Sequence, residues 1–400
     1  MNPAGPLQGI RIVDLTTVIM GPYATQILAD YGADVIKVEP PEGDIMRGAA
    51  PMKGPKMGHL HLQMNRNKRG VVLDMKKEGG RRALLRLCEK ADVFVHNVRP
   101  AAMRRLRLSY AEVRAANPRI VYASLLGFGS GGPYAGKPAY DDLIQGACGV
   151  PWLLLASGAE SPRYVPATMG DRTVGLNLAV AVCAALYCRE RTGKGQRVDV
   201  PMFESLLNLL MGDHLGGHTF EPPLGGPGYT RLLSKDRRPY ATRDGYVCVL
   251  IYNDKQWKSF FDLIGRPEML PEPRFATPEA RSRHVDEIYA FVAQEMKKRT
   301  TSQWLEALER ADIPVQRMNS LDDILADPHL AATGYFAGVD HPSEGRVRAM
   351  RVPSEWSETP PAYRRHAPRL GEHSREVLRE AGYTDAAIDA LLAQGITHAG

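Results

Sequence analysis

The residue with the clearest chemical potential is Asp171, which lies between Gly170 and Arg172 at the start of a long apolar segment. The segment from Val174 to Cys188 is rich in Ala and Leu and too long for a buried strand, so it predicts a core helix. Asp is favoured as an N-cap residue, and Gly170 would allow a sharp turn before it. Asp171 is therefore either an ordinary helix cap or a nucleophilic carboxylate at the mouth of a site. Taken alone, the stretch favours the cap.

Two glycine-rich segments could bind the oxygen atoms of an acyl or phosphate group. The loop from Gly127 to Asp142 contains closely spaced glycines, which would let backbone N–H groups approach an anion. A second glycine turn lies at Gly225, Gly226 and Gly228. Glycine loops are also common connectors, so a plain flexible turn is the alternative for both segments.

Two clusters of cations are candidates for binding phosphates. Three arginines lie within Met103–Leu108, just past the end of a predicted strand, where open α/β sheets bind their ligands. The segment Asn65–Gly70 carries three more cations, and a solvated run of charge is the ordinary alternative there.

Patterns that indicate other chemistries are absent or incomplete. The first strand–helix joint lacks the GxGxxG fingerprint of dinucleotide enzymes, and the TGKG segment around Lys194 lacks the first glycine of a P-loop. His214 and His218 have i,i+4 spacing, but two glycines lie between them and no HExxH motif occurs. The sequence therefore predicts no metal site and no nicotinamide cofactor.

Composition limits the partners and the compartment. The chain has 400 residues, of which 44% are apolar and 24% charged, as in ordinary globular proteins. A net charge of +6 is mild for this length and argues against nucleic-acid binding. The five cysteines are scattered without a CxxC motif, and no uncharged apolar run reaches the ~18 residues of a membrane span. We expect a cytoplasmic protein that binds no membrane.

Hydrophobic periodicity predicts an α/β fold with two domains. Strand–helix–strand units over residues 10–39 and 71–98 have short joints, which predicts a parallel, Rossmann-like sheet, and residues 42–70 are expected to form a long surface loop. A hairpin about Asp244-Gly245 followed by helices predicts a smaller α+β domain. We divide the chain into a large domain (1–215), a linker (216–239), a small domain (240–320) and a C-terminal part (321–400).

Read in order, several segments resemble the class III CoA-transferases, the family of formyl-CoA transferase and carnitine CoA-transferase. They are LQGIRIVDLTTVIMGP, GADVIKVEPPEGD, NKRGVVLDMK, ADVFVHNVRPAAMRRL, GFGSGGPY with PAYD, MGD at 169–171, TGKGQRVDVPMFES, IPVQRMNSLDDILADPHL and LGEHSREVL. Each motif is weak alone, but their shared order and spacing cover nearly the whole chain.

This resemblance implies an interlocked homodimer in which each chain is a ring threaded through the other. It also implies that residues 321–400 return to the large, CoA-binding domain. The expected substrates are an acyl-CoA and a carboxylic acid, with coenzyme A as co-substrate and no metal. The expected reaction moves CoA between them through an aspartyl-CoA thioester.

Individual residues carry over from the same motifs. The family's catalytic aspartate matches Asp171, and the tyrosine beside its catalytic site matches Tyr140. The positions expected to bind CoA lie in four segments of the chain: Val18, Leu73, Lys76, Asn97, Val98, Arg105, Lys137 and Tyr140.

Two positions depart from formyl-CoA transferase. Ile19 stands where that enzyme has a glutamine, which argues against a formyl or oxalate substrate. Pro40 stands where it has a CoA-binding arginine, so other cations would bind the nucleotide end, with Arg47, Arg66 and Arg69 as candidates.

Two alternatives stay open at this point. A 2-methylacyl-CoA racemase of the same superfamily would use the same CoA site, but its histidine falls at Tyr140, and tyrosine is a poor base at neutral pH. A CoA-binding module without catalysis is disfavoured by the intact Met-Gly-Asp motif beside Tyr140.

Overall fold

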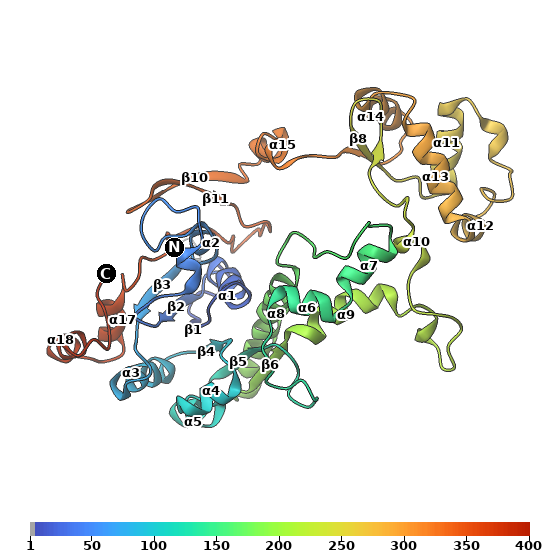
Figure 1. Cartoon of the computed structure of the whole chain (residues 1–400). Helices are drawn as coiled ribbons and strands as arrows, with labels where there is room; N and C mark the ends of the chain where they lie inside the picture. The colour runs from blue at the N-terminus through green and yellow to red at the C-terminus, as the bar shows by residue number, and fades with distance from the viewer. Residues whose placement is uncertain (1–4) are drawn as a thin grey trace. The chain divides into compact units, whose positions relative to one another are not determined.

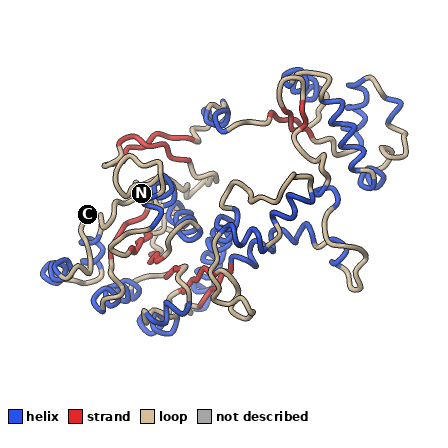
Figure 2. The backbone as a smooth tube through the Cα atoms, viewed as in Figure 1, coloured by secondary structure: helices blue, strands red, loops and turns tan. Residues whose placement is uncertain are grey.

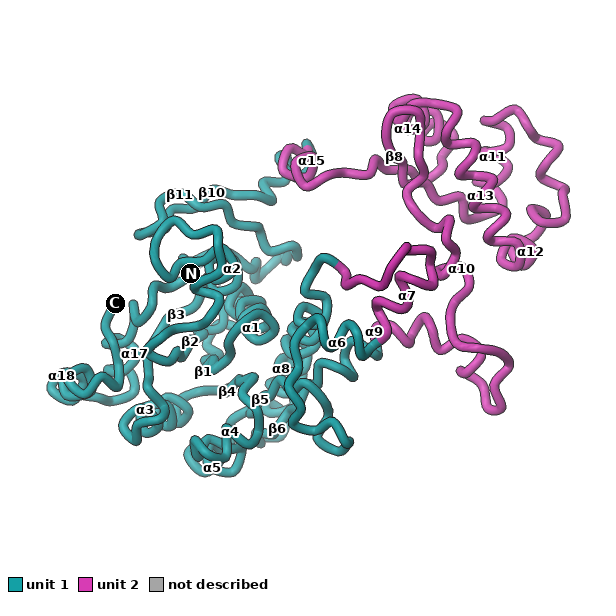
Figure 3. Tube along the Cα trace, viewed as in Figure 1, with its two compact units in different colours: residues 1–148, 166–208, 328–400 teal, residues 149–165, 209–327 magenta. Residues whose placement is uncertain are grey.

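The structure is a computed structural model that describes residues 5–400 (Figure 1). The chain forms two compact units (Figure 3). Unit 1 contains the described part of residues 1–148 together with 166–208 and 328–400, and unit 2 contains 149–165 and 209–327. The domain limits drawn from the sequence divide the chain differently and stay a prediction.

Unit 1 is organised around a six-stranded sheet of order β3-β2-β1-β4-β5-β6, in which every neighbouring pair is parallel. Its strands are β1 (Arg11–Leu15), β2 (Asp34–Glu39), β3 (Lys68–Val72), β4 (Val93–His96), β5 (Val121–Leu126) and β6 (Arg197–Pro201). The predicted α/β class and Rossmann-like sheet are confirmed. The strand order reverses between β1 and β4, and open α/β sheets bind ligands outside the carboxyl ends of their strands at such a point.

Helices cover both faces of this sheet, because alternate side chains of each strand point to opposite faces. Val13 and Leu15 pack into a core with five helices: α3 (Glu78–Glu89), α4 (Pro100–Arg105), α5 (Tyr110–Ala116), α17 (Ser374–Glu380) and α18 (Asp385–Ala393). The opposite face is covered by α1 (Met20–Asp30) and α8 (Met169–Thr192), which also pack against each other. Both ends of the chain thus contribute to one core.

Residues 42–70, expected to be a long surface loop, contain regular structure (Figure 2). They include η1 (Ile45–Gly48), α2 (His59–Met64) and the first residues of β3. The prediction was wrong because this segment packs against distant residues: the backbone N–H of Asn67, for example, donates to the carbonyl of Arg365. The rest of unit 1 comprises α6 (Asp141–Ala147), the start of α9 (Met202–His214), α16 (Pro328–Ala332) and the antiparallel pair β10 (Phe336–His341) and β11 (Gly345–Met350).

Unit 2 has a three-stranded antiparallel sheet of order β7-β8-β9 around an aromatic core that includes Trp257 and Trp304. Its elements are α7 (Val150–Ala156), η2 (Gly216–Thr219), α10 (Thr230–Leu233), β7 (Tyr240–Ala241), β8 (Tyr246–Val249), α11 (Asp254–Ile264), η3 (Pro267–Met269), α12 (Pro278–Arg283), α13 (Val285–Met296), α14 (Thr301–Arg310), β9 (Val315–Arg317) and α15 (Leu321–Leu325). The hairpin about Asp244-Gly245 is confirmed. Helix α14 is capped by Thr300, whose side chain accepts from the backbone N–H of Gln303.

Candidate active site

The joint between β1 and α1 lies at the carboxyl end of β1, beside the reversal of strand order. Its residue Val18 has φ 71°, a left-handed conformation that is unusual for a β-branched side chain. The backbone N–H of Val18 donates to Oδ1 of Asp44 at 3.2 Å. The side chain of Asn97, which follows β4, bonds to both backbone groups of Thr17, at 3.1 Å and 2.8 Å. The structure therefore brings the predicted residues Val18 and Asn97 to neighbouring segments.

The position of Val98 is set by a buried histidine on β4. The ring Nδ1 of His96 donates to the Val98 carbonyl at 3.1 Å, and Nε2 lies 3.1 Å from the hydroxyl of Ser124. Burial lowers the pKa of His96 to about 4, so the ring is neutral at pH 7 and has one N–H to give. This arrangement orients the backbone of the second joint at the carboxyl edge of the sheet.

Asp171 is not the N-cap that its sequence context suggested. Helix α8 begins at Met169 after Thr168, so Asp171 is the third helical residue. Gly170 is part of the helix too, and a Cβ there would lie 2.9 Å from the Met202 side chain and 3.2 Å from Asp141 Oδ1. Gly170 is thus required by close packing around the aspartate. The sequence reading missed this because both contacting residues are about 30 positions away.

The Asp171 carboxyl group is buried and lacks a compensating partner. Asp171 is 8% exposed, and no side chain or backbone group in residues 5–400 hydrogen-bonds to its carboxylate. Burial, followed by the negative charge of Asp141, raises the pKa of Asp171 to about 7, while Arg172 opposes the shift. A carboxylate with so high a proton affinity is a stronger nucleophile than an exposed one, and perturbed groups of this kind cluster at functional sites.

Asp141 is the functional candidate that the sequence reading missed. Its Oδ1 accepts from the backbone N–H of Asp171 at 2.9 Å, and its Oδ2 accepts from the side chain of Gln145 at 2.6 Å. The signal was present in the sequence, since Asp141 and Asp142 directly follow Tyr140. Only the fold distinguishes them: Asp141 is buried at the start of α6, whereas Asp142 is exposed.

The start of α8 lies directly against the start of α1. A Cβ at Gly175 would come within 2.8 Å of the Met20 carbonyl oxygen, and the guanidinium of Arg172 stacks 4.3 Å from the centre of the Tyr23 ring. Because Met20 is two residues beyond Val18, the candidate nucleophile and the β1–α1 joint are parts of one packed region of unit 1.

The remaining predicted CoA-binding residues lie in segments that follow β3, β4 and β5. Lys76 and Arg105 are exposed, the first in the turn before α3 and the second at the end of α4. Lys137 Nζ lies over the ring of Tyr134, at 4.1 Å, and Tyr140 is 66% exposed immediately before α6.

Leu73 differs from these residues because its side chain is fully buried in the core, and its N–H donates to the Glu39 carbonyl. A contact with CoA would therefore involve its backbone carbonyl. The ligand roles of Leu73 and of the other predicted residues stay predictions.

The three arginines suggested as substitutes at the nucleotide end have other roles. Arg47 is 1% exposed and forms a two-point ion pair with Glu39, at 2.6 Å and 2.7 Å. Arg66 pairs with Asp30 at 2.7 Å. Arg69 pairs with three carboxylates, those of Asp34, Glu376 and Glu380. These cations hold the C-terminal part and α1 to the sheet. The suggestion that they bind the nucleotide end of CoA was therefore wrong.

One backbone N–H of the glycine loop that was expected to approach an anion is also engaged. The backbone N–H of Gly129 donates to Oε1 of Glu204 at 2.9 Å, which fixes the glycine loop to α9 within unit 1. Within residues 5–400, no three His, Cys, Asp or Glu side chains are grouped to hold a metal ion.

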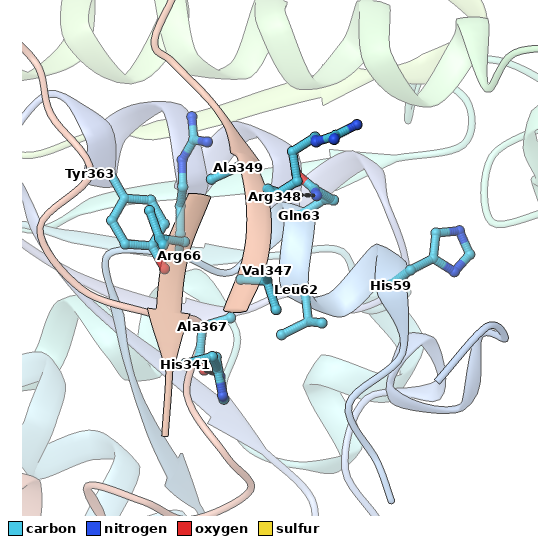
Figure 4. Close-up of a pocket in the computed structure, with 11 residues that line it drawn as sticks. His59, Leu62, Gln63, Arg66, His341, Val347, Arg348, Ala349, Tyr363 and Ala367 are labelled. Carbon is cyan, nitrogen blue, oxygen red and sulfur yellow. Dashed lines mark hydrogen bonds between the residues drawn. The ribbon is translucent and has the colours of Figure 1, made fainter. Parts of the chain in front are cut away.

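A cavity of about 300 Å³ lies between α2 and the β10–β11 hairpin (Figure 4). Two of its polar lining groups are already paired: Gln63 donates to the Arg348 carbonyl, and His341 Nε2 lies 2.9 Å from the Ala367 carbonyl. Arg66, one of the cations suggested for the nucleotide end of CoA, lines it, but the other predicted site residues do not. The cavity is therefore separate from the region around Asp171 and Val18.

With this geometry established, comparison with known proteins decides the family. A model of CoA-transferase family III matches residues 7–374. The chain belongs to CoA-transferase family III. The sequence-based assignment to a class III CoA-transferase is thereby confirmed.

Relatives of known name agree with this family. The formyl-CoA:oxalate CoA-transferase of Streptomyces avermitilis is 35% identical, covering 98% of this chain and 99% of that protein. The enzyme of that name from Rhodopseudomonas palustris is 34% identical, covering 98% and 97%. An acyl-CoA transferase of Fusarium pseudograminearum is also 34% identical, covering 98% and 88%.

Solved structures share the fold. A CAIB/BAIF family protein from Brucella suis has a TM-score of 0.79 at 29% identity, covering 94% of this chain and all of that one. The protein Rv3272 from Mycobacterium tuberculosis has a TM-score of 0.80 at 29% identity, covering 94% and 99%.

Helix α8 of this family III protein is long and apolar enough to cross a membrane by length and composition alone. Half of its most apolar window is buried in the structure, and the core helix of a globular protein passes the same test. The helix is therefore weak evidence for a membrane span.

Proposed function

We propose that this protein transfers CoA from an acyl-CoA donor to a carboxylic acid, with Asp171 as the covalent nucleophile. The observation that carries the proposal is the state of this carboxyl group. It is buried, has no hydrogen-bond partner in the described chain and has a pKa raised to about 7. Such a group combines ionisation near neutral pH with high basicity, as covalent catalysis by a carboxylate requires.

The first half of the reaction moves CoA onto the protein. The Asp171 carboxylate attacks the thioester carbonyl of the donor, the C–S bond breaks, and CoA thiolate leaves, giving a mixed anhydride. The thiolate then attacks the aspartyl carbonyl of the anhydride. This step releases the donor as a free carboxylate and leaves an aspartyl-CoA thioester.

The second half reverses these steps with the acceptor. The acceptor carboxylate attacks the aspartyl thioester, CoA thiolate leaves again, and a new mixed anhydride forms. Attack of the thiolate on the acceptor's acyl carbonyl gives the product acyl-CoA and restores the Asp171 carboxylate. Bonds and charge balance at each step, and no oxidant or metal is needed.

The proposed CoA path runs along the carboxyl edge of the sheet. The backbone near Val18 and Val98 would face the pantetheine arm, and exposed cations such as Lys76 and Arg105 would bind phosphates through charge-assisted hydrogen bonds. Relatives named formyl-CoA:oxalate CoA-transferase act on small polar acids, but Ile19, which is 7% exposed, is apolar. We therefore propose an acceptor less polar than oxalate, in a cytoplasmic enzyme.

We further propose that the active form is the interlocked homodimer implied by the family. Support comes from α8, whose outer face carries large apolar side chains at helical spacing. Leu176 is 49% exposed, Val180 70% and Tyr187 64%. An exposed apolar stripe on a long core helix is typical of a protein–protein interface.

The decisive experiment is mass spectrometry of the protein after incubation with acyl-CoA donors and hydroxylamine. We expect an Asp171 hydroxamate in the wild type, no transfer by Asp171→Asn, and unchanged CoA binding by that variant in calorimetry. Transfer at the wild-type rate by Asp171→Asn would refute the proposal. Exchange of the α-proton of a 2-methylacyl-CoA in D₂O, without an acceptor acid, would indicate the racemase instead.

A further inference from the structure

The backbone of Thr16–Val18 is held by side chains from three surrounding segments. The Nζ of Lys37, on β2, donates to the carbonyl of Thr16 at 3.0 Å. The side-chain amide of Asn97, after β4, bonds to both the N–H and the carbonyl of Thr17. Oδ1 of Asp44, after β2, accepts from the backbone N–H of Val18 at 3.2 Å. The joint is thus fixed at each residue before any ligand binds.

This fixation coincides with local strain. Val18 has φ 71°, where its Cβ and γ-methyl groups crowd the backbone. A β-branched residue keeps such a conformation only when its surroundings over-determine it, and residues of this kind cluster where ligands bind. Without the hydrogen bond to Asp44, the joint would relax toward negative φ and turn the backbone groups of residues 18 and 19.

Asp44 is itself held rigidly by buried charges. Its Oδ2 lies 2.9 Å from Lys37 Nζ, and both side chains are completely buried. Its backbone N–H donates to Oε2 of Glu39 at 2.9 Å. A buried ion pair contributes little stability compared with an apolar pair of the same volume, because both charges lose their water. The pair is therefore better explained by what it positions than by the stability it gives.

We propose that Asp44 is a positioning residue for the acyl-CoA substrate. It holds the β1–α1 joint in the strained form that receives the thioester, and Lys37 acts as its counter-ion. The inference rests on the proposed function, because it takes Val18 as part of the CoA site. The inference goes beyond the proposed function because it makes the affinity for CoA depend on Asp44, a residue that does not contact CoA.

The test compares two double variants that both remove the buried charges. Lys37→Met/Asp44→Asn keeps an acceptor oxygen for the N–H of Val18, whereas Lys37→Met/Asp44→Leu removes it. We expect the KM for acyl-CoA to be about tenfold higher in the leucine variant than in the asparagine variant, with kcat changed much less. Adding Val18→Gly to the leucine variant should lower KM again, since glycine adopts positive φ without strain.

A matched control separates positioning from general destabilisation. Asp30→Asn also removes a carboxylate from a buried ion pair of unit 1, that with Arg66, but at the far end of α1. It should lower the melting temperature without a selective rise in KM. Equal KM values in the two double variants, or no rescue by Val18→Gly, would overturn the inference.

Two results keep this inference separate from the proposed function. If wild-type protein binds no CoA in calorimetry, the proposed function fails, whatever the variants do. If the double variants do not fold, a crystal structure of the wild type decides the matter: a negative φ at Val18, or no bond from its N–H to Asp44, would overturn the inference, and the strained bonded joint would support it.

Discussion

The side chain of Asp141 accepts a hydrogen bond from the backbone N–H of Asp171 at 2.9 Å. The bond ties the start of α6 to the first turn of α8 and sets a second carboxylate beside the candidate nucleophile. Like charges held this close disfavour ionisation of one partner, which adds to the effect of burial on the pKa of Asp171. In the proposed mechanism these two chemically similar groups take different roles, with Asp171 reactive and Asp141 supporting.

The first prediction concerns the pH dependence of transfer. In the proposed mechanism Asp171 attacks as a carboxylate, so kcat/KM for the donor should rise through about pH 7 and then level off. Asp141→Asn removes a neighbouring negative charge, so the midpoint should move to lower pH. Asp142→Asn, at the exposed neighbouring position, should leave it in place. A midpoint that is the same in all three proteins would contradict this electrostatic account.

The second prediction concerns stability. Between pH ~4 and 7 the folded protein holds a proton on Asp171 that the unfolded chain gives up, so burial of the ionised group costs more as pH rises. Asp171→Asn should therefore raise the melting temperature, and more at pH 8 than at pH 5. Each tenfold change in proton affinity corresponds to ~1.4 kcal/mol, so the gain at pH 8 should reach a few kcal/mol. Scanning calorimetry at both pH values measures it, and a larger gain at pH 5 would show the sign to be wrong.

The third prediction uses two glycines in helices. A Cβ at Gly175 would lie 2.8 Å from the Met20 carbonyl oxygen, whereas a Cβ at Gly212 in α9 would meet no atom within 4 Å. Gly175→Ala should force α1 away from α8, lower stability by ~1–3 kcal/mol and raise the KM for acyl-CoA. Gly212→Ala should be neutral or add ~0.5–1 kcal/mol. Urea denaturation of both variants measures the difference, and equal effects would refute the packing argument.

The fourth prediction concerns assembly. Val180→Glu places a charge in the middle of the exposed apolar stripe of α8 and should convert the proposed dimer to monomer in light scattering, with loss of transfer. Ala386→Glu, on an exposed face of α18, should leave the mass unchanged. A dimer that survives Val180→Glu would show that the stripe is not part of the interface.

Much of unit 1 could be predicted because the signals are local. The alternation of residues 10–15, the apolar strand before Asn97 and the long apolar segment after Asp171 each follow the period of one element. Gly32, directly after the C-cap of α1, has φ 106°, a conformation that glycine adopts without strain. The hairpin turn at Asp244-Gly245 could likewise be predicted from the local sequence.

The errors share a different physical cause. Arg66 and Arg69 looked like free cations, because partners such as Asp30 and Glu380 are 36 and 311 residues away from the arginines they bind. An ion pair across such a separation forms only when the fold brings both groups together. The same reason hid Asp141, whose role depends on which of two adjacent aspartates turns inward.

The sequence by itself determined the α/β class and the family, because motif order and hydrophobic periodicity are properties of the chain, and it singled out Asp171 as the candidate nucleophile. Only the tertiary structure decided that Asp171 lies inside the first turn of α8, that Asp141 sits against it, and that Asp44 and Asn97 fix a strained Val18. Burial and distance set these electrostatic relationships, and both arise only when remote segments pack together.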